Sequence, residues 1–121
     1  MSAEILDAAN GILTLRITGK LTYPELSAVQ DSGAEILRRE GKMCILVLGQ
    51  GFQGWEPDSR WDDISFQLEN DQFIEKIAFV AEPKWEELVV AFAGKDLRSC
   101  LIEFFVPADL AKARAWLVAK S

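Results

Sequence analysis

Histidine is absent from this sequence, and only two cysteines, Cys44 and Cys100, are present. Without histidine the chain cannot form a Ser-His-Asp triad, a Cys-His pair or the commonest zinc sites. Both cysteines lie within apolar, strand-like runs, where a thiol usually packs as a small buried hydrophobe. We therefore expect two buried, reduced thiols in a cytoplasmic protein.

Positive charge is also scarce, because 13 Lys and Arg stand against 19 Asp and Glu and leave a net charge of −6. This balance argues against a nucleic-acid partner, since DNA and RNA binding needs clustered Lys and Arg to displace counterions from phosphates. It also disfavours a purely electrostatic association with anionic lipid.

Long hydrophobic runs are missing as well, and none approaches the length of about 18 residues that a membrane-spanning helix needs. The first ten residues, MSAEILDAAN, lack the basic and apolar segments of a signal peptide. These features predict a cytoplasmic protein, at most peripheral to the inner membrane. A chain of 121 residues without linker or repeat predicts one domain over residues 1–121.

The pattern of strands and helices predicts an α/β fold. Residues 3–6 and 12–18 read as two strands joined by Asn10-Gly11, the dipeptide that a type I′ hairpin turn prefers. Residues 43–48 (MCILVL) form an apolar run without alternation, as expected for a central strand covered on both faces. Two more strands are expected within residues 74–81 and 97–106.

Four helices are expected between and after these strands. The first is signalled by a capping box, in which Thr22 is followed three residues later by Glu25, and Gly41 can end it. Further helices are expected near residues 60–70, after Pro83 and after Pro107, and Leu88 is expected to face inward on the second of these. The order β-β-α-β-α-β-α-β-α predicts a mostly parallel sheet with an N-terminal antiparallel hairpin strand.

The stretch from residue 49 to residue 70 carries the main functional candidates. Three glycines, Gly49, Gly51 and Gly54, can act as hinges. On the following helix, Trp61, Ile64 and Leu68 are expected to share the inward face. Phe66 is expected to lie well round the helix from that face. The candidate contacts for a ligand or a membrane are Phe52, Trp55, Trp61, Ile64 and Phe66. The alternatives are that these side chains complete the core or form a dimer contact.

Acidic residues surround the same stretch, at Glu56, Asp58, Asp62 and Asp63. Their oxygen atoms suit Mg²⁺ or Ca²⁺, but their spacing matches no calcium loop, and acids at a helix start already gain from the helix dipole. Residues 49–54 (GQGFQG) match a dinucleotide glycine pattern after the third strand instead of the first. We predict no metal, no cofactor and no catalytic residues.

Several short runs resemble the SpoIIAA-like proteins, small bacterial domains similar in fold to the STAS domains of anti-sigma-factor antagonists. These runs are residues 19–22 (GKLT), 52–55 (FQGW), 61–63 (WDD), 77–80 (IAFV), 84–85 (KW) and 115–117 (AWL). The resemblance covers nearly the whole chain. It implies a β/α superhelix with a sheet of four or five strands.

The resemblance also implies a switch that works by phosphorylation of a serine. In the antagonists, a serine in an Asp-Ser-Ser-Gly motif after the central strand is phosphorylated to change partners. Ser59 stands at about this position, in the run Glu56-Pro57-Asp58-Ser59, but the second serine and the glycine are absent. An N-cap role explains Ser59 better than a phosphorylation site, because a phosphate would sit among carboxylates.

Two functions follow from these features. The first is a non-enzymatic binding or regulatory domain, in which a mobile amphipathic loop-helix over residues 49–70 covers an apolar groove. Its partner would be a small hydrophobic ligand or a membrane surface. The second is a protein-interaction switch of the antagonist type, acting on a protein partner through Ser59. A homodimer through exposed aromatic surface is a further expectation.

Overall fold

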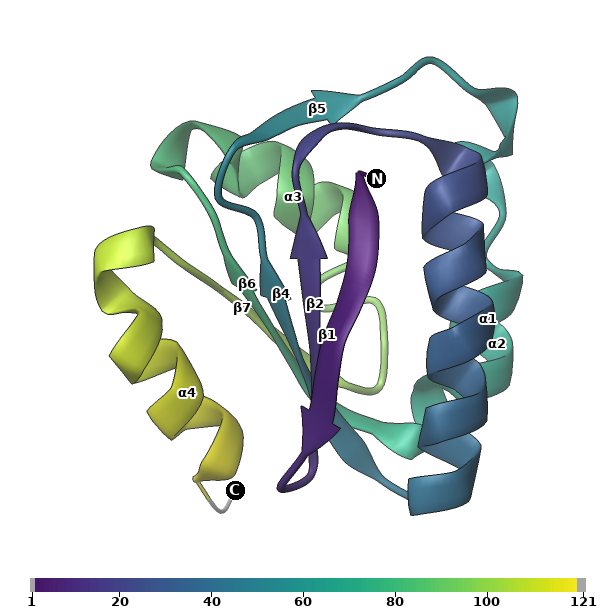
Figure 1. The fold of residues 1–121 in the computed structure, drawn as a ribbon, viewed down its shortest axis with the longest axis vertical. Helices are drawn as coiled ribbons and strands as arrows, with labels where there is room; N and C mark the ends of the chain where they lie inside the picture. Colours follow the sequence, from purple (N-terminus) through teal and green to yellow (C-terminus); the bar gives the residue numbers. More distant parts are fainter. Residues whose placement is uncertain (1, 120–121) are drawn as a thin grey trace.

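The computed structural model describes residues 2–119, within which five strands form one sheet in the order β1-β2-β4-β6-β7 (Figure 1). A separate pair, β3 and β5, lies beyond the end of this sheet. The strands are β1 (Ala3–Ala9), β2 (Ile12–Ile17), β3 (Gly19–Leu21), β4 (Met43–Leu48), β5 (Phe52–Trp55), β6 (Ile74–Val80) and β7 (Leu101–Phe105). The α-helices are α1 (Tyr23–Glu40), α2 (Ser65–Asn70), α3 (Glu86–Ala93) and α4 (Leu110–Val118).

The N-terminal hairpin forms as predicted. Asn10 and Gly11 have φ values of 57° and 77°, the positive values that a type I′ turn requires. The first strand is longer than expected, because its pairing with β2 continues to the turn, where Ala9 lies opposite Ile12. The other neighbouring pairs of the sheet, β2 with β4, β4 with β6 and β6 with β7, are parallel. The predicted α/β fold with a mostly parallel sheet is therefore confirmed.

The central strand β4 has both faces covered, as its continuous apolar run predicts. Ile45 and Val47 belong to the hydrophobic core under α1 and α3. Cys44 and Leu46 point the other way, into a smaller core under α4. Figure 1 shows α4 on one side of the sheet and α1 with α2 on the other, so the two faces are covered unequally.

Helix α1 starts at the predicted capping residue. The Thr22 hydroxyl accepts a hydrogen bond of 3.3 Å from the backbone N–H of Glu25. The Glu25 carboxylate does not close the box on the Thr22 backbone, but accepts a 2.6 Å bond from the N–H of Ser2. That bond holds the beginning of β1 against the start of α1, and it lowers the pKa of Glu25. Gly41 ends the helix with a φ of 86°.

A buried lysine holds α4 to the sheet. Lys76 on β6 is only 2% exposed, and its Nζ donates hydrogen bonds of 2.7 Å to the carbonyls of Trp116 and Ala119. These carbonyls stand at the C-terminal end of α4, where backbone acceptors lack partners within the helix and a cation is favoured. The ammonium also lies 5.1 Å from the centre of the Trp116 ring.

Around α3, the structure agrees with the prediction for the following strand and differs from it for one residue of the helix. The last strand, β7, lies within the predicted range 97–106 and begins at Leu101, because residues 94–100 form turns after Gly94, which ends α3 with a φ of 75°. Leu88 of α3 is 55% exposed, although a place inside was expected. The helix packs through Val89 and Ala93, whose exposures are 7% and 4%.

Candidate functional site

The stretch after β4 is a strand where an irregular loop was expected. Residues Phe52–Trp55 form β5, which pairs in parallel with β3, so that Leu21 lies opposite Trp55. Phe52 is buried at 7% exposure and belongs to a core cluster with Leu21, Val29 and Val89. Pairing with β3 gives the backbone of this stretch its partners, including the bond from Gly19 N–H to Gly51 C=O at 2.9 Å.

The three expected hinge glycines have different surroundings. A Cβ at Gly49 would lie 3.1 Å from the Cβ of Ala81, so this glycine permits a close approach of two strands' ends. Gly54 has a φ of 100° and faces the Trp85 ring. Gly51 also has a positive φ, of 82°, but its side-chain position is open. Hinge motion at these positions stays a prediction.

Aromatic rings run in a continuous series from β5 to α1. Successive ring centres are 5.0 to 5.6 Å apart, and the planes are mostly close to perpendicular, the edge-to-face geometry that aromatic pairs prefer. The series contains Trp85, Phe52, Trp55, Phe92, Trp61 and Tyr23. Trp85 and Phe92 come from η3 (Pro83–Trp85) and α3, and their position beside the glycine-rich stretch was not predicted.

Residues 58–70, called the lid below, were expected to hold one helix and instead hold two. The first is a 3₁₀ helix, η1 (Ser59–Asp62), capped by Asp58, whose Oδ1 accepts a 2.9 Å bond from the backbone N–H of Arg60. The second is α2, and Asp63 between them has extended backbone, with φ −73° and ψ 114°. Asp63 in turn accepts a 2.9 Å bond from the N–H of Ser65 at the start of α2.

This break reverses the expected orientation of the lid side chains. Leu68 is 76% exposed and Ile64 is 50% exposed, whereas Phe66 is partly buried and packs against the core with Leu13 and Ile45. The prediction that Leu68 faces inward and Phe66 outward is therefore wrong. Helical periodicity fixes relative positions only within one uninterrupted helix, and the extended residue at Asp63 resets the phase of α2.

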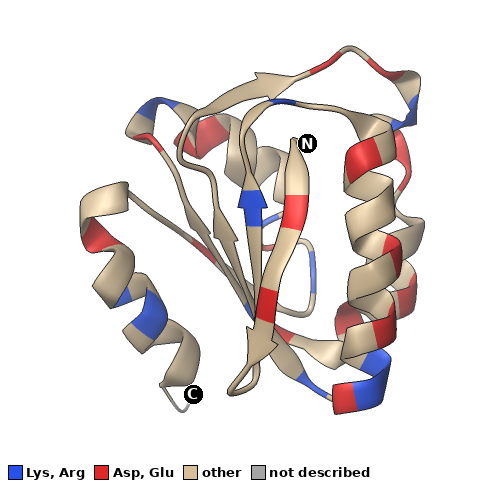
Figure 2. Cartoon of the chain, in the orientation of Figure 1, with Lys and Arg blue, Asp and Glu red and all other residues tan. Residues whose placement is uncertain are grey.

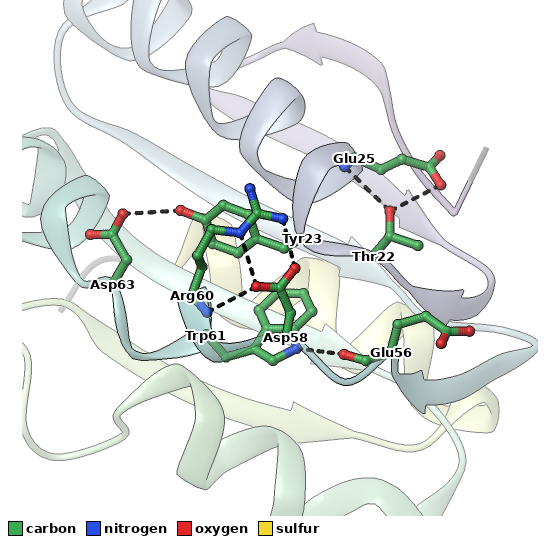
Figure 3. A network of polar contacts seen from close by, with 8 residues as sticks. All are labelled: Thr22, Tyr23, Glu25, Glu56, Asp58, Arg60, Trp61 and Asp63. Carbon is green, nitrogen blue, oxygen red and sulfur yellow. Dashed lines mark hydrogen bonds and ion pairs between the residues drawn. The ribbon is translucent and has the colours of Figure 1, made fainter.

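A network of polar contacts fastens the lid to neighbouring elements (Figure 3). The hydroxyl of Tyr23 on α1 donates a 3.0 Å hydrogen bond to Asp63, and the Trp61 Nε1 donates a 2.7 Å bond to the carbonyl of Glu56. The Arg60 guanidinium lies 4.4 Å from the centre of the Tyr23 ring and pairs with Asp58 at 2.7 Å. All these side chains lie on the lid or at the start of α1, so the network joins these two parts of the fold.

The same contacts shift the acidities of the groups involved. Hydrogen bonds from Arg60 lower the pKa of Asp58 to about 2. The bonds from Ser65 and Tyr23 lower the pKa of Asp63, and the bond to Asp63 raises the pKa of Tyr23. These carboxylates are therefore ionised at neutral pH, where each acts as an acceptor. A general acid would need a raised carboxyl pKa, which is the opposite shift.

Two apolar cavities lie beneath the lid and β5. The larger has a volume of about 160 Å³, is bounded by the sheet face, α1, α3 and the lid, and is partly open to solvent. Its apolar lining includes Leu13, Leu15, Val29, Ile45, Ile77, Phe79 and Phe92, and its polar lining includes Tyr23, Gln30, Asp63, Gln67 and Arg98. The smaller, of about 50 Å³, lies under β5 and shares Ile17, Leu21, Val47, Phe79 and Phe92 with the first.

All five residues expected to contact a ligand or membrane line one of these cavities. Trp61, Ile64 and Phe66 line the larger one, and Phe52 and Trp55 line the smaller one. The structure thus brings the five together, while contact with a ligand stays a prediction. The wall that α1 contributes was not predicted, although its residues Tyr23, Leu26, Gln30 and Gly33 recur at helical spacing.

The remaining candidates lie on the outer surface of the lid. Ser59 is exposed at the first position of η1, and Asp58, not Ser59, caps this helix. Phosphorylation of Ser59 stays a prediction. Throughout the described residues 2–119, no three acidic or cysteine side chains are grouped so that they could hold a metal ion. Within the same residues, no helix is both long and apolar enough to cross a membrane.

Comparison with known proteins found a matching family and a solved structure of similar fold. The model of the SpoIIAA-like family matches residues 12–118. The chain belongs to the SpoIIAA-like family. The structure also resembles the crystal structure of an uncharacterised protein of the DUF3478 family from Shewanella loihica PV-4, which is described as having a SpoIIAA-like fold. The two are 19% identical in sequence with a TM-score of 0.67, over 95% of this chain and 91% of that one.

The family match confirms the resemblance that the short sequence runs indicated. At 19% identity, the Shewanella structure supports the fold alone. Among curated proteins, no significant match was found. The function of this SpoIIAA-like domain therefore has to be argued from its own cavities and lid.

Proposed function

We propose that this SpoIIAA-like domain is a non-enzymatic binding module that encloses a small hydrophobic ligand beneath its lid. The observation that supports this most is the cavity of about 160 Å³ between the sheet, α1, α3 and the lid. Protein interiors are normally packed with few voids larger than a water molecule. An engineered apolar cavity of about 150 Å³ in another protein stays dry and binds benzene, so this volume suits a benzene-sized group.

The lid is the element best suited to admit such a ligand. Apart from Trp61 and Phe66, which pack against the core, it buries little apolar surface, since Ile64 and Leu68 are exposed. Its polar and ring contacts with α1 centre on Tyr23, which donates a hydrogen bond to Asp63, packs against the Trp61 ring and lies beside the Arg60 guanidinium. Elements held by few buried contacts open at low free-energy cost. A backbone rotation at Asp63 that moves the lid would widen access to the cavity without disturbing the sheet.

Benzene binding measured by nuclear magnetic resonance tests this proposal. Titrating the ¹⁵N-labelled protein with benzene should give saturable shifts at residues around the cavity, in β2, α1, α3 and the lid. The variant Ala93→Leu, which adds apolar volume at a buried cavity-lining position, should weaken this binding at least tenfold. Leu68→Ala, on the outer face of the lid, is the control and should leave it unchanged.

The melting temperature of each variant establishes that it is folded, because overpacking a core costs typically about 1–3 kcal/mol. The proposal fails if the wild-type protein shows no saturable shifts. It also fails if Ala93→Leu is folded and binds benzene as well as the wild type.

One observation favours a second role, in which the lid rests on a membrane surface. Ile64 and Leu68 are exposed apolar side chains on the same short segment, and a single such side chain contributes about 1.5–3 kcal/mol on leaving water. Flotation with neutral and anionic vesicles tests this role, comparing the wild type with an Ile64→Ser, Leu68→Ser double variant. Flotation of both proteins, or of neither, would exclude a lid-mediated contact. Trp55 and Phe66 are unsuited to this test because both pack inside.

A further inference from the structure

A third cavity, with a polar lining, lies between α1 and α2 beside the larger apolar cavity. Its volume is about 100 Å³. Its lining consists of Tyr23, Ser27, Gln30 and Asp31 from α1 and of Asp63, Ser65, Phe66, Glu69 and Asn70 from the lid. Nothing in the fold requires a hollow here, since two helices of this kind commonly pack side chain against side chain.

Asn70 is an unusual member of this lining. The residue is 1% exposed, and its side-chain Nδ2 donates a 2.9 Å hydrogen bond to the carbonyl of Phe66. Its Oδ1 is buried and accepts no hydrogen bond from any of residues 2–119. Buried polar atoms almost always have a partner, and a buried acceptor without one is costly. Because Asn70 belongs to the lining, a hydrogen-bond donor held in this cavity would lie close to the unpartnered oxygen.

The charge of the lining points in the same direction. Asp31, Asp63 and Glu69 are acidic, and the set contains no lysine or arginine. Asp63 already accepts bonds from Tyr23 and Ser65, whereas Asp31 and Glu69 form no ion pair within residues 2–119. Figure 2 shows acidic residues along α1 and α2, with the basic residues of α1 at its C-terminal end. A donor that carries positive charge fits this surplus of acceptors best.

The polar cavity and the larger apolar cavity are adjacent and share part of their lining. Tyr23, Gln30, Asp63 and Phe66 line both of them. From these observations we infer that the ligand of this domain is an amphipathic amine, whose apolar body occupies the larger cavity and whose ammonium group lies between α1 and α2. This inference rests on the proposed function, because the apolar body needs the cavity beneath the lid.

Three probes that share an apolar body and differ in their head group test the inference. The probes are 2-phenylethylammonium, 2-phenylethanol and 3-phenylpropanoate, titrated at pH 7 into the ¹⁵N-labelled protein. The ammonium probe should bind about three- to tenfold more tightly than the alcohol, as expected for two partly exposed carboxylates, and the carboxylate probe should bind most weakly. The shifts caused by the ammonium probe should include residues of α1 and α2 that line the polar cavity.

Two charge-matched double variants locate the effect. Asp31→Asn with Glu69→Gln should remove the preference for the ammonium probe and leave binding of the alcohol unchanged. Glu35→Gln with Glu40→Gln removes two exposed charges of α1 away from the cavity and should keep the preference. All four residues are exposed, so both variants should fold.

The outcomes separate the two proposals. Equal binding of the three probes would overturn the amine inference and leave the proposed function standing, with water as the partner of Asn70. An ammonium preference that survives in the Asp31 and Glu69 variant would overturn the placement of the head group. Binding of none of the three probes would count against the inference and the proposed function together.

Discussion

Two glycines near the cavities should respond in opposite ways to the same substitution. Gly33 lies in the middle of α1 and lines the larger cavity, with its carbonyl and N–H in the helix. A Cβ at this position would lie 3.4 Å from the Cδ2 of Leu13, an ordinary van der Waals contact. Glycine inside a helix is about 0.8–1.0 kcal/mol less favourable than alanine. Gly33→Ala should therefore stabilise the fold by about 1 kcal/mol.

Gly54→Ala should destabilise the fold. Its φ of 100° is a backbone conformation that residues with a Cβ rarely adopt, and the Cβ would lie 3.3 Å from the Trp85 ring. Holding a non-glycine residue in such a region costs about 1–3 kcal/mol. The Trp85 ring has little room to withdraw, because it packs against Phe52, whose ring centre is 5.0 Å away.

Thermal and urea unfolding, followed by circular dichroism, measure both changes. For a domain of this size, 1 kcal/mol corresponds to about 4 °C in melting temperature. The expected order is Gly33→Ala above the wild type and Gly54→Ala below it. A lower melting temperature for Gly33→Ala would refute the cavity wall described for α1. An unchanged or higher one for Gly54→Ala would refute the tight packing of β5 on Trp85.

Three further predictions concern the lid and the thiols. Urea unfolding of Leu68→Ala should change the unfolding free energy by less than about 0.5 kcal/mol, whereas Phe66→Ala, which removes a ring packed on the core, should cost about 2 kcal/mol. Asp58 has a folded pKa of about 2 against an ordinary value of 3.8, so its contribution to stability should be complete above pH 4 and be lost as the pH falls toward 2, in acid unfolding curves. Burial raises the pKa of Cys44 and Cys100, so iodoacetamide at neutral pH should label neither thiol before unfolding, as judged by intact mass.

Each of these predictions has a control or a contrary result. Equal losses for Leu68→Ala and Phe66→Ala would contradict the orientation of α2. Asp58→Asn should flatten the acid limb of the stability curve, and an unaltered limb would show that the carboxylate is unpaired in solution. Rapid labelling of Cys44 in the folded protein would mean that α4, whose Leu117 carbonyl lies 3.3 Å from its sulfur, separates easily from the sheet.

Much of the fold could be predicted from the sequence because its signals are local. The Asn10-Gly11 turn depends on two residues that tolerate positive φ, and the start of α1 depends on Thr22 reaching a backbone N–H three residues away. The run at residues 43–48 requires cover on both faces whatever surrounds it. The SpoIIAA-like resemblance extended these local signals to the whole order of elements, which the family match confirms.

The lid shows where such reasoning fails. The acidic and aromatic residues at positions 58–66 looked like the start of one amphipathic helix, and Phe66 was accordingly placed outside. One extended residue, Asp63, breaks the periodicity, and nothing in the local sequence requires the break. The bond that Asp63 accepts from Tyr23 joins residues 40 positions apart, so only the assembled fold brings them within reach.

By itself, the sequence determined most elements of this protein, because turns, caps and continuous apolar runs act over a few residues. It also singled out residues 49–70 as the candidate functional region. The tertiary structure alone decided which side chains of that region point inward, that β5 pairs with β3, and that α1 and α3 supply the remaining walls of the cavities. A cavity is the space left between elements distant in sequence, and its existence depends on how those elements pack. No pattern along the chain records that packing.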